Sequence, residues 1–518
     1  MSVKRQAAYG LTLFLTSAAS LVVEIVAGRM LAPYVGMSLY TWTAIIAVVL
    51  AGFSIGHWIG GRLAAPQIPA ATALRGIALA LLLAGLTAGG AAPLLHWLAG
   101  ILVESRAPPL LLITLLAGGI FFLPSLFVGI VSPVLTKLAI DDAPDRQGPV
   151  IGRMFALGAA GSILGTLSAG YLFISWIGSS GTMLAVAVLY LAFALAYGLQ
   201  GRRRAIAVPV IALLIFAAIG LARLPGFAAP CHTESDYYCI RVIDFAPQSG
   251  RPSAAMVLDH LAHSINDRDD PTLLYSPYLH FVAERTRRLL EGQPPRAYFV
   301  GGGAFTLPRA WAAAFPDAAL TVAEIDPAVT RVAAEAMWLR PDAPGLRIIH
   351  ADARHTLATL PPEQRFDLIL GDAFHDFSIP SHLVTREFHQ LVRRRLVPGG
   401  AYAINVIDQS EAPRFTFALV KTMQQDFPVV EVWLDDDSRR RGGRVTFVVL
   451  GLAEPSASPM LRAADPVSRL GQRVWLRWPE DDLNRRIAAV DPPVLTDDFA
   501  PVDRLMAGFL LRPDEILR

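Results

Sequence analysis

Four chemically useful positions follow four successive apolar runs in the second half of this 518-residue chain. The run Ala297-Tyr-Phe-Val leads into Gly301-Gly302-Gly303, and three glycines allow a backbone to approach a ligand closely. Glu324 ends the next run, where a carboxylate can accept hydrogen bonds from both hydroxyls of a ribose. Asp352 ends the third run, where its carboxylate could accept a hydrogen bond from an adenine amino group. Asp372 ends the fourth run, where a reacting group would lie. This pattern predicts a nucleoside-type ligand.

These positions require a sheet that brings the ends of its strands together. Apolar runs that alternate with helical patterns predict an open, mainly parallel α/β sheet with helices on both faces. In such sheets ligands bind beyond the carboxyl ends of the strands. Asp326 and Ala353 are assigned to the same nucleoside site, and Asp326 also suits a helix cap because Pro327 follows it. We expect strands at 297–300, 320–323, 346–350, 366–370, 401–406, 428–434 and 444–451, and helices at 306–315, 327–339 and 385–396.

A smaller region precedes this sheet. Alternating polar and apolar residues over 236–265 predict a small antiparallel β-region, and a helix is expected at 271–291 with Pro271 at its start. The chain is therefore divided into a transmembrane helical domain (1–224), a β-region with a linking helix (225–292) and a Rossmann-like α/β domain (293–518).

The first part of the chain is the most apolar. Hydrophobic residues make up 53% of the whole chain and charged residues only 17%, which is too apolar for one ordinary soluble domain. Crossing a hydrocarbon core of roughly 30 Å takes about 20 helical residues. Seven stretches meet this length and predict a multi-pass protein of the cytoplasmic (inner) membrane, embedded in the lipid bilayer. They lie near 8–33, 41–63, 74–98, 108–138, 152–176, 180–199 and 205–222.

Charge is divided unevenly along the chain. Residues 1–230 carry 5 acidic and 13 basic side chains, whereas the remainder carries 38 acidic and 32 basic ones. The second half is net acidic and so gives no support to nucleic-acid binding. Ten of the basic residues in the first half flank loops on one side, so the positive-inside rule favours a cytoplasmic N-terminus. With seven spans the C-terminal domain would be extracytoplasmic, but a change of one helix reverses this, and its side is left unassigned.

The two cysteines of the chain, Cys231 and Cys239, follow the last apolar stretch. They could bridge a loop, which would suit an oxidising compartment, or stay as two free thiols. No pair with metal-ligand spacing is present, and we expect no metal.

Taken together, the motifs of the second half resemble the spermidine synthase family, the aminopropyltransferase branch of the S-adenosylmethionine methyltransferase fold. The resemblance covers about 255–405 well and 405–505 loosely, and the whole chain resembles the membrane-fused members of that family. It rests on Leu258-Asp259, Gly301-Gly302-Gly303, Glu324-Ile325-Asp326-Pro327, Asp352, Asp372, Thr385-Arg386-Glu387-Phe388 and Pro398-Gly399-Gly400.

This resemblance implies a transferase that moves an aminopropyl or related group from decarboxylated S-adenosylmethionine, or S-adenosylmethionine, to a putrescine-like amine. It implies that the glycine loop and Glu324 hold the nucleoside, that Asp352 contacts adenine, and that Asp372 orients and deprotonates the amine. His375 and Asp376 join Asp372 as expected catalytic residues. The acceptor is expected to contact Asp259, His263, Tyr275, Tyr278 and His382.

Several family positions are changed in this chain. Ala304 stands where the family has an aspartate for the amino group of the substrate, and His375 stands in place of the second acid after strand 4. His263 replaces a glutamine, and Arg441-Gly442-Gly443 replaces a Tyr-Gly-Gly segment. A diamine is dicationic and normally needs matched carboxylates, so the acceptor is left open.

Two other functions are kept open beside the aminopropyl transfer. One is a methyltransferase-fold enzyme that acts on a membrane-bound or extracytoplasmic acceptor. The other is a transporter-like or scaffolding membrane protein with a degenerate nucleoside site. A homodimer is compatible with each of these functions.

Overall fold

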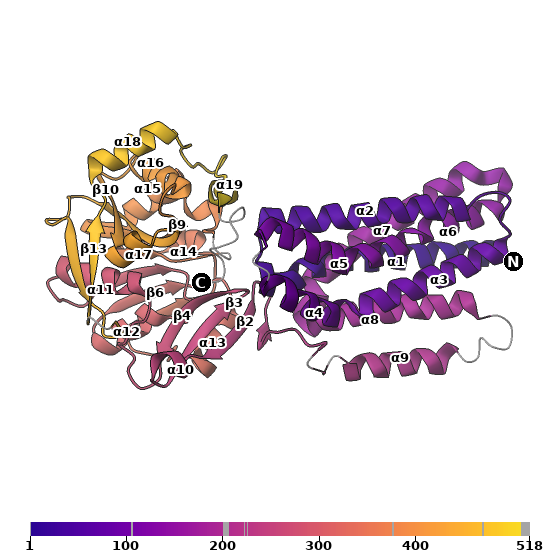
Figure 1. The fold of residues 1–518 in the computed structure, drawn as a ribbon, viewed down its shortest axis with the longest axis horizontal. Coiled ribbons are helices and arrows are strands. Elements are labelled where there is room, and N and C mark those ends of the chain that lie inside the picture. Colours follow the sequence, from indigo (N-terminus) through magenta and orange to yellow (C-terminus); the bar gives the residue numbers. More distant parts are fainter. Residues whose placement is uncertain are drawn as a thin grey trace. The chain divides into compact units, whose positions relative to one another are not determined.

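The computed structural model describes residues 2–104, 107–199, 207–221, 223–224, 226–374, 378–468 and 471–508. The chain forms two compact units, Met1–Cys239 and Ile240–Arg518, and each is described by itself. The first is helical and the second is built on β-sheets, as Figure 1 shows. The three-part division at residues 224 and 292 stays a prediction.

The helical unit contains five segments that are long and apolar enough to cross a membrane: Lys4–Val35, Leu39–Leu63, Ala70–Gly89, Pro109–Asp141 and Pro144–Gly198. Two shorter apolar helical stretches are Ala91–Leu102 and Pro209–Leu221. The elements are α1 (Ser2–Val35), α2 (Leu39–Leu63), α3 (Ala70–Gly89), α4 (Ala91–Glu104), α5 (Pro109–Gly129), α6 (Val131–Asp141), η1 (Pro144–Arg146), α7 (Gln147–Ser168), η2 (Ala169–Phe173), α8 (Ile174–Gly198) and α9 (Ala207–Leu221).

The expected count of seven spans is not confirmed. The stretch predicted as one span at 74–98 is divided at Gly90 into α3 and α4. The two spans predicted at 152–176 and 180–199 run together within Pro144–Gly198, a segment of 55 residues. That segment is longer than one crossing needs, and its helical geometry is interrupted at Gly178, where φ is 69°. Residues 205 and 206 of the last predicted span lie outside the described residues.

Close contact between helix backbones holds this unit together. A Cβ atom at Gly52, Gly56 or Gly60 of α2 would collide with the backbone of residues 122–130. On α7, Gly161 and Gly165 stand against the backbone of α1 in the same way. Glycines spaced along one face of a helix allow such an approach, which agrees with the role expected of small residues in membrane helices.

A disulfide-closed hairpin follows the helices of this unit. Cys231 and Cys239 form a disulfide, which settles the pairing that the sequence left open. Within the hairpin, Glu234 in the short strand β1 (Thr233–Glu234) accepts hydrogen bonds from the backbone N and the Oγ of Ser179. Arg29 of α1 donates to the carbonyl oxygens of Ser235 and Tyr237, at 2.7 and 2.6 Å. The hairpin is therefore attached to both α1 and α8.

The second unit begins with the small antiparallel region that the sequence predicted. Strands β2 (Cys239–Asp244), β3 (Ser253–Leu258) and β4 (Leu261–Asp267) pair in order. The short α10 (Ala246–Ser249) connects β2 and β3. The following helix, α11 (Pro277–Leu289), begins at Pro277 and not at Pro271, so that start was wrong. Either proline suits the first turn of a helix, and the sequence alone favoured the earlier one.

A nine-stranded sheet forms the centre of this unit, in the order β12-β13-β10-β11-β9-β8-β5-β6-β7. The pairs from β7 to β9 are parallel and those from β9 to β12 are antiparallel, so a mainly parallel core carries an antiparallel extension. The strands are β5 (Arg296–Val300), β6 (Ala319–Ala323), β7 (Leu346–Ile349), β8 (Phe366–Gly371), β9 (Leu396–Gln409), β10 (Val429–Asp435), β11 (Arg444–Leu452), β12 (Met460–Ala464) and β13 (Gln472–Arg477).

Every residue of β8 is buried, which requires cover on both faces of the sheet, as predicted. The sequence did not predict β12 and β13, which lie at one edge. The covering and connecting helices are α12 (Thr306–Ala314), α13 (Pro327–Ala336), α14 (Ala353–Thr359), η4 (Ser381–Leu383), α15 (Arg386–Arg395), α16 (Arg414–Met423), α17 (Asp436–Arg441), α18 (Glu480–Val490) and α19 (Val502–Met506).

Candidate functional site

The glycine loop joins β5 to α12 at the carboxyl end of the parallel strands. Gly301 and Gly303 have φ angles of 93° and 51°, which L side chains rarely adopt. A Cβ atom at Gly301 would lie 2.9 Å from the carbonyl oxygen of Asp372. The loop therefore lies directly against the end of β8, where Asp372 begins the next loop.

Glu324 connects this loop to the next strand. Its carboxylate accepts a hydrogen bond from the backbone N of Gly302 at 2.8 Å and another from the backbone N of Asp326 at 2.9 Å. The residue is only 5% exposed, and burial raises the pKa of its carboxyl to about 7. Each oxygen keeps a further lone pair, so the side chain can still accept ribose hydroxyls when ionised.

Asp352 follows β7 and caps α14, because its Oδ1 accepts from the backbone N of His355 at 2.9 Å. Its Oδ2 lies 2.7 Å from Nε2 of His382. The pKa of the Asp352 carboxyl is lowered: its hydrogen bonds and the charge of His382 outweigh burial, the largest single influence, which acts in the opposite direction. The neighbouring Ala353 is buried, and its carbonyl accepts from the Tyr298 hydroxyl at 2.7 Å. Asp352, the residue expected to contact adenine, is therefore bonded to His382.

Asp372 is held by two donors at the end of β8. The hydroxyl of Tyr278, on α11, donates to Oδ2 at 2.6 Å, and Nδ2 of Asn405, on β9, donates to Oδ1 at 2.8 Å. Burial raises the pKa of the Asp372 carboxyl to about 6, although both hydrogen bonds lower it. The side chain is thus a fixed carboxylate that can take up a proton near neutral pH.

The strand β4 forms a further side of the site. Oγ of Ser264 accepts from the backbone N of Ala304 at 3.1 Å, which fixes the far end of the glycine loop. The ring of the preceding residue, His263, contacts the ring of Phe374 edge-on, at 6.4 Å between centroids. Burial, and then the charge of His260, lowers the pKa of His263 to about 4, so His263 is neutral at pH 7. Asp259, in the turn between β3 and β4, is 1% exposed.

The other predicted residues are placed as follows. Asp326 caps α13, as expected, by accepting from the backbone N of Ala328 at 2.8 Å. Tyr275 donates its hydroxyl to Asp267 at 3.1 Å. His375 and Asp376 lie outside the described residues. The roles assigned to all of these residues stay predictions.

Sequence reasoning missed Asn405 and Ser264. Asn405 was the one polar side chain inside the apolar run predicted as the fifth strand, and a buried amide in such a run is a usable signal. Ser264 carried no signal that separates it from an ordinary strand serine. Across the described residues, no group of three or more His, Cys, Asp and Glu side chains is arranged to hold a metal ion.

Comparison with known sequences supports the predicted resemblance. The chain is 30% identical over 139 residues to a polyamine aminopropyltransferase from Vibrio vulnificus, covering 27% of this chain and 46% of the relative. It is 28% identical over 222 residues to a probable polyamine aminopropyl transferase from Bifidobacterium longum, covering 40% and 48%. The chain thus spans about half the length of these curated relatives. The resemblance to the spermidine synthase family is confirmed, although no family model matches.

The chain is only distantly similar to solved structures. A crystal structure of a probable spermidine synthase from Corynebacterium glutamicum shows 22% identity and a TM-score of 0.44, covering 52% of this chain and 97% of that chain. A human methyltransferase-like protein 13 in complex with SAH shows 18% identity and a TM-score of 0.29, covering 43% and 95%.

Proposed function

We propose that this protein is a membrane-anchored transferase that moves an aminopropyl or related alkyl group from a sulfonium nucleoside to an amine. The donor would be decarboxylated S-adenosylmethionine or S-adenosylmethionine. The similarity to polyamine aminopropyltransferases supports the reaction class. The apolar helices support the membrane anchor.

The observation that carries this proposal is the environment of Asp372. A mostly buried carboxylate stands beside the glycine loop, held by Tyr278 and Asn405, and its pKa is raised to about 6. An ordinary aspartate would be a weak base at pH 7, whereas this one is closer to the pKa that general-base catalysis favours. A carboxylate that only stabilises the fold would have no reason to lie beside the expected nucleoside site.

The reaction needs little help for its leaving group. The nitrogen of the amine forms a bond to the carbon next to the sulfonium sulfur, and the carbon–sulfur bond breaks with its electron pair going to sulfur. Sulfur leaves as a neutral thioether, and the nitrogen loses one proton, which Asp372 accepts. The protein therefore has to align the three atoms and keep the amine unprotonated. The hydrogen bonds that Tyr278 and Asn405 donate to Asp372 hold its carboxylate in place and so help this alignment.

The acceptor differs from a diamine such as putrescine in this proposal. His263 is neutral at pH 7 and lies against Phe374, so it offers no charge to a second ammonium group. Ala304 offers no carboxylate to the donor's amino group. An amine with a single cationic nitrogen fits these residues better, because each buried ammonium needs its own anionic partner.

The position of the α/β unit on one side of the membrane is part of the proposal. The disulfide Cys231–Cys239 and the distribution of basic loops both favour an extracytoplasmic side. Adenosyl compounds are made in the cytoplasm, so an extracytoplasmic site would need a supply across the membrane. A reporter enzyme fused after Arg518, active on only one side, decides between the two sides.

Product analysis tests the reaction. The purified full-length protein is incubated with either donor and with a panel of mono- and diamines, and products are identified by mass spectrometry. Transfer of an aminopropyl group from the decarboxylated donor is expected. Transfer of a methyl group from S-adenosylmethionine would instead establish the methyltransferase alternative.

Substitution of the base tests its role. Asp372→Asn should reduce the transfer rate by roughly a thousandfold while methylthioadenosine still binds, because general-base catalysis contributes about 10²–10⁴. Asp408→Asn is the matched control, since Asp408 is also a buried carboxylate with a pKa raised to about 6 but holds Thr416. Full turnover by the Asp372 variant would contradict the assignment. Absence of methylthioadenosine binding to the folded wild type would favour a non-catalytic protein.

A further inference from the structure

A second pocket lies toward the amino ends of the parallel strands, whereas the glycine loop lies at their carboxyl ends. Its volume is about 490 Å³, and it is formed by the end of α12, the loop after α13 and the start of β7. Because α12 begins at the glycine loop and runs back along the sheet, its last turn reaches the amino ends of the strands. Leu346, the first residue of β7, lines the pocket at that edge.

Among the described residues, the charged side chains that line this pocket are three arginines, Arg268, Arg309 and Arg340. Arg268 forms an ion pair with Asp269 at 2.9 Å, and Asp269 does not line the pocket. The other lining residues are apolar or aromatic, and they include Ala312, Trp338 and Leu339. A site of 300–1,000 Å³ with apolar walls and a few convergent polar groups is typical of small-molecule binding, at roughly the size seen here. The charge of the polar groups indicates an anion.

Arg309 is the central cation of this pocket. It is 8% exposed, and its guanidinium donates to backbone carbonyls: Nε to the oxygen of Trp338 at 3.2 Å and Nη2 to that of Asp267 at 2.7 Å. No carboxylate forms an ion pair with it among the described residues. Burial lowers the pKa of the Arg309 guanidinium, and the charges of the nearby Asp267 and Asp270 act against that shift without an ion pair, so a further anion in contact with the guanidinium would be favoured.

Trp338 is held in an unusual conformation beside this arginine. Its φ angle is 59°, which a bulky side chain adopts only under constraint. Nε of Arg309 fixes its carbonyl, and Nδ2 of Asn266 fixes the carbonyl of Met337 at 3.0 Å. The constraint keeps the half-buried indole at the wall of the pocket.

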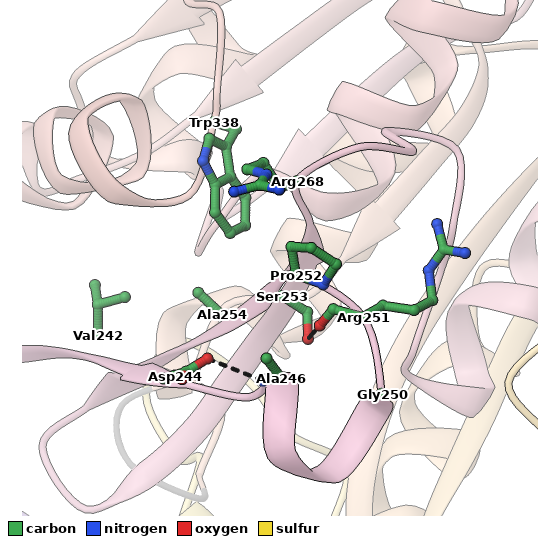
Figure 2. Close-up of a pocket in the computed structure, with 10 residues that line it drawn as sticks. All are labelled: Val242, Asp244, Ala246, Gly250, Arg251, Pro252, Ser253, Ala254, Arg268 and Trp338. Atoms are coloured by element: carbon green, nitrogen blue, oxygen red, sulfur yellow. Dashed lines mark hydrogen bonds between the residues drawn. The ribbon is translucent and has the colours of Figure 1, made fainter.

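The wall of Arg268 and Trp338 separates this pocket from a neighbouring one of about 660 Å³ against β2 and β3. Figure 2 shows Arg268 and Trp338 on one side of that neighbouring pocket, and Val242 and Asp244 toward the other. Asp244 lines the neighbouring pocket together with Arg251 and Arg268, whereas no carboxylate is among the described residues that line the pocket beside Arg309.

From this arrangement we infer that the pocket between α12 and the loop after α13 binds an amphipathic organic anion, a phosphate monoester or carboxylate attached to an apolar group. Arg309 and Arg340 contact the anionic group, and Trp338, Ala312 and Leu339 cover the apolar part. The donor and the amine of the proposed reaction are cations, so this ligand is neither of them. Binding here is independent of the proposed transferase activity.

Titration calorimetry of the full-length protein in phosphatidylcholine nanodiscs, with phenyl phosphate as probe, tests this inference. Saturable binding is expected, with neither benzyl alcohol nor inorganic phosphate binding comparably, because the first lacks the charge and the second the apolar group. Arg340→Glu should weaken phenyl phosphate binding by about tenfold or more, since charged hydrogen bonds of this kind contribute strongly. Arg347→Glu is the matched control, because Arg347 is exposed on β7 and does not line the pocket.

Trp338→Leu supplies a second variant that keeps every charge, and weaker binding of the aromatic probe is expected. Circular dichroism and thermal unfolding show whether each variant is folded. Nanodiscs that contain phosphatidic acid distinguish the two sources of the anion: competition with phenyl phosphate indicates a lipid headgroup, and its absence a soluble metabolite. Lack of saturable binding, or equal binding by wild type and Arg340→Glu, overturns the inference.

Discussion

Glycines have opposite uses in the helical unit and in the α/β unit. In the helical unit Gly56 and Gly161 keep ordinary helical geometry and remove side chains so that two backbones touch. In the α/β unit Gly301 and Gly303 adopt positive φ angles and form a loop that exposes its backbone. The first use stabilises packing between helices, and the second permits a tight turn after β5, where the proposed nucleoside would bind.

Buried charge separates the two units further. The α/β unit buries the carboxylates of Glu324 and Asp408, and most of that of Asp372, near strand ends, each with hydrogen-bond donors. The helical core cluster consists of apolar side chains such as Val26, Ile45 and Leu81. Helices satisfy their own backbone, so they can pack by shape alone. Strand ends leave backbone N–H groups that carboxylates can occupy.

The largest expected effect comes from the helix contacts. Gly161→Leu should lower the free energy of unfolding by about 3 kcal/mol, because the new side chain must displace the backbone of α1. Unfolding by denaturing detergent measures the change. Gly152→Leu on the same helix is the control, since no described atom lies within 4 Å of its added Cβ. Equal effects of the two substitutions would show that α1 and α7 do not touch at Gly161.

The disulfide comes next. Cys231 and Cys239 are separated by 8 residues, and closing a loop of this length contributes about 2.5 kcal/mol. Replacement of both cysteines by serine should lower the thermal stability of the helical unit, which the hairpin joins through Arg29 and Ser179. Reductant should destabilise the wild type alone. A wild type that does not respond to reductant would mean that the bond contributes nothing.

The buried carboxylate Glu324 gives a smaller effect that depends on pH. Its pKa is raised from 4.5 to about 7, so the folded state binds this proton more tightly than the unfolded chain, and ionisation between these values destabilises the protein. Glu324→Gln does not ionise, so its stability relative to wild type should increase by roughly 2 kcal/mol from about pH 4.5 to about pH 8. Denaturant titration of both proteins across this range measures the difference.

Glu335→Gln is the matched control for this experiment, because Glu335 is exposed on α13. Its stability relative to wild type should not change with pH over the same range. A flat difference for Glu324→Gln as well would show that Glu324 is solvated and not buried.

The smallest effect is expected at the surface. Arg440 pairs with Asp436 and Asp437 while 67% exposed. Such pairs contribute about 0.5 kcal/mol or less, because water and salt screen them. Arg440→Ala should therefore change the denaturation midpoint very little. A loss of free energy of unfolding as large as that of a buried group would contradict the contrast between the surface and the strand ends.

The positions of strands β5 to β11 along the chain were predictable because local patterns determine them. Gly301, Glu324, Asp352 and Asp372 each end an apolar run, and parallel strands bring such ends to one edge. The pairing of His382 with Asp352 was not predictable, because 30 residues separate them and a loop conformation decides where the histidine lies. Asn405 reaches Asp372 only because β9 lies beside β8.

Helix boundaries were predictable where a single signal was present. Asp326-Pro327 marked the start of α13 correctly, since an acid cap and a proline act together. The sequence favoured Pro271 as the start of the next helix, whereas α11 begins at Pro277, a second proline that also suits the first turn. The interruption at Gly178 falls between the spans predicted at 152–176 and 180–199, and the backbone N of the neighbouring Ser179 donates to Glu234 in the hairpin, a contact that no local pattern predicts.

Glu324 bonds the loop after β5 and the loop after β6 at the same time, through Gly302 and Asp326. The two amide protons are therefore shielded before any small molecule arrives, and their hydrogen exchange should already be slow in the free protein. The loop would then need little further ordering when a ligand binds. The enthalpy of binding would therefore report contacts with the ligand itself and not the ordering of a flexible loop.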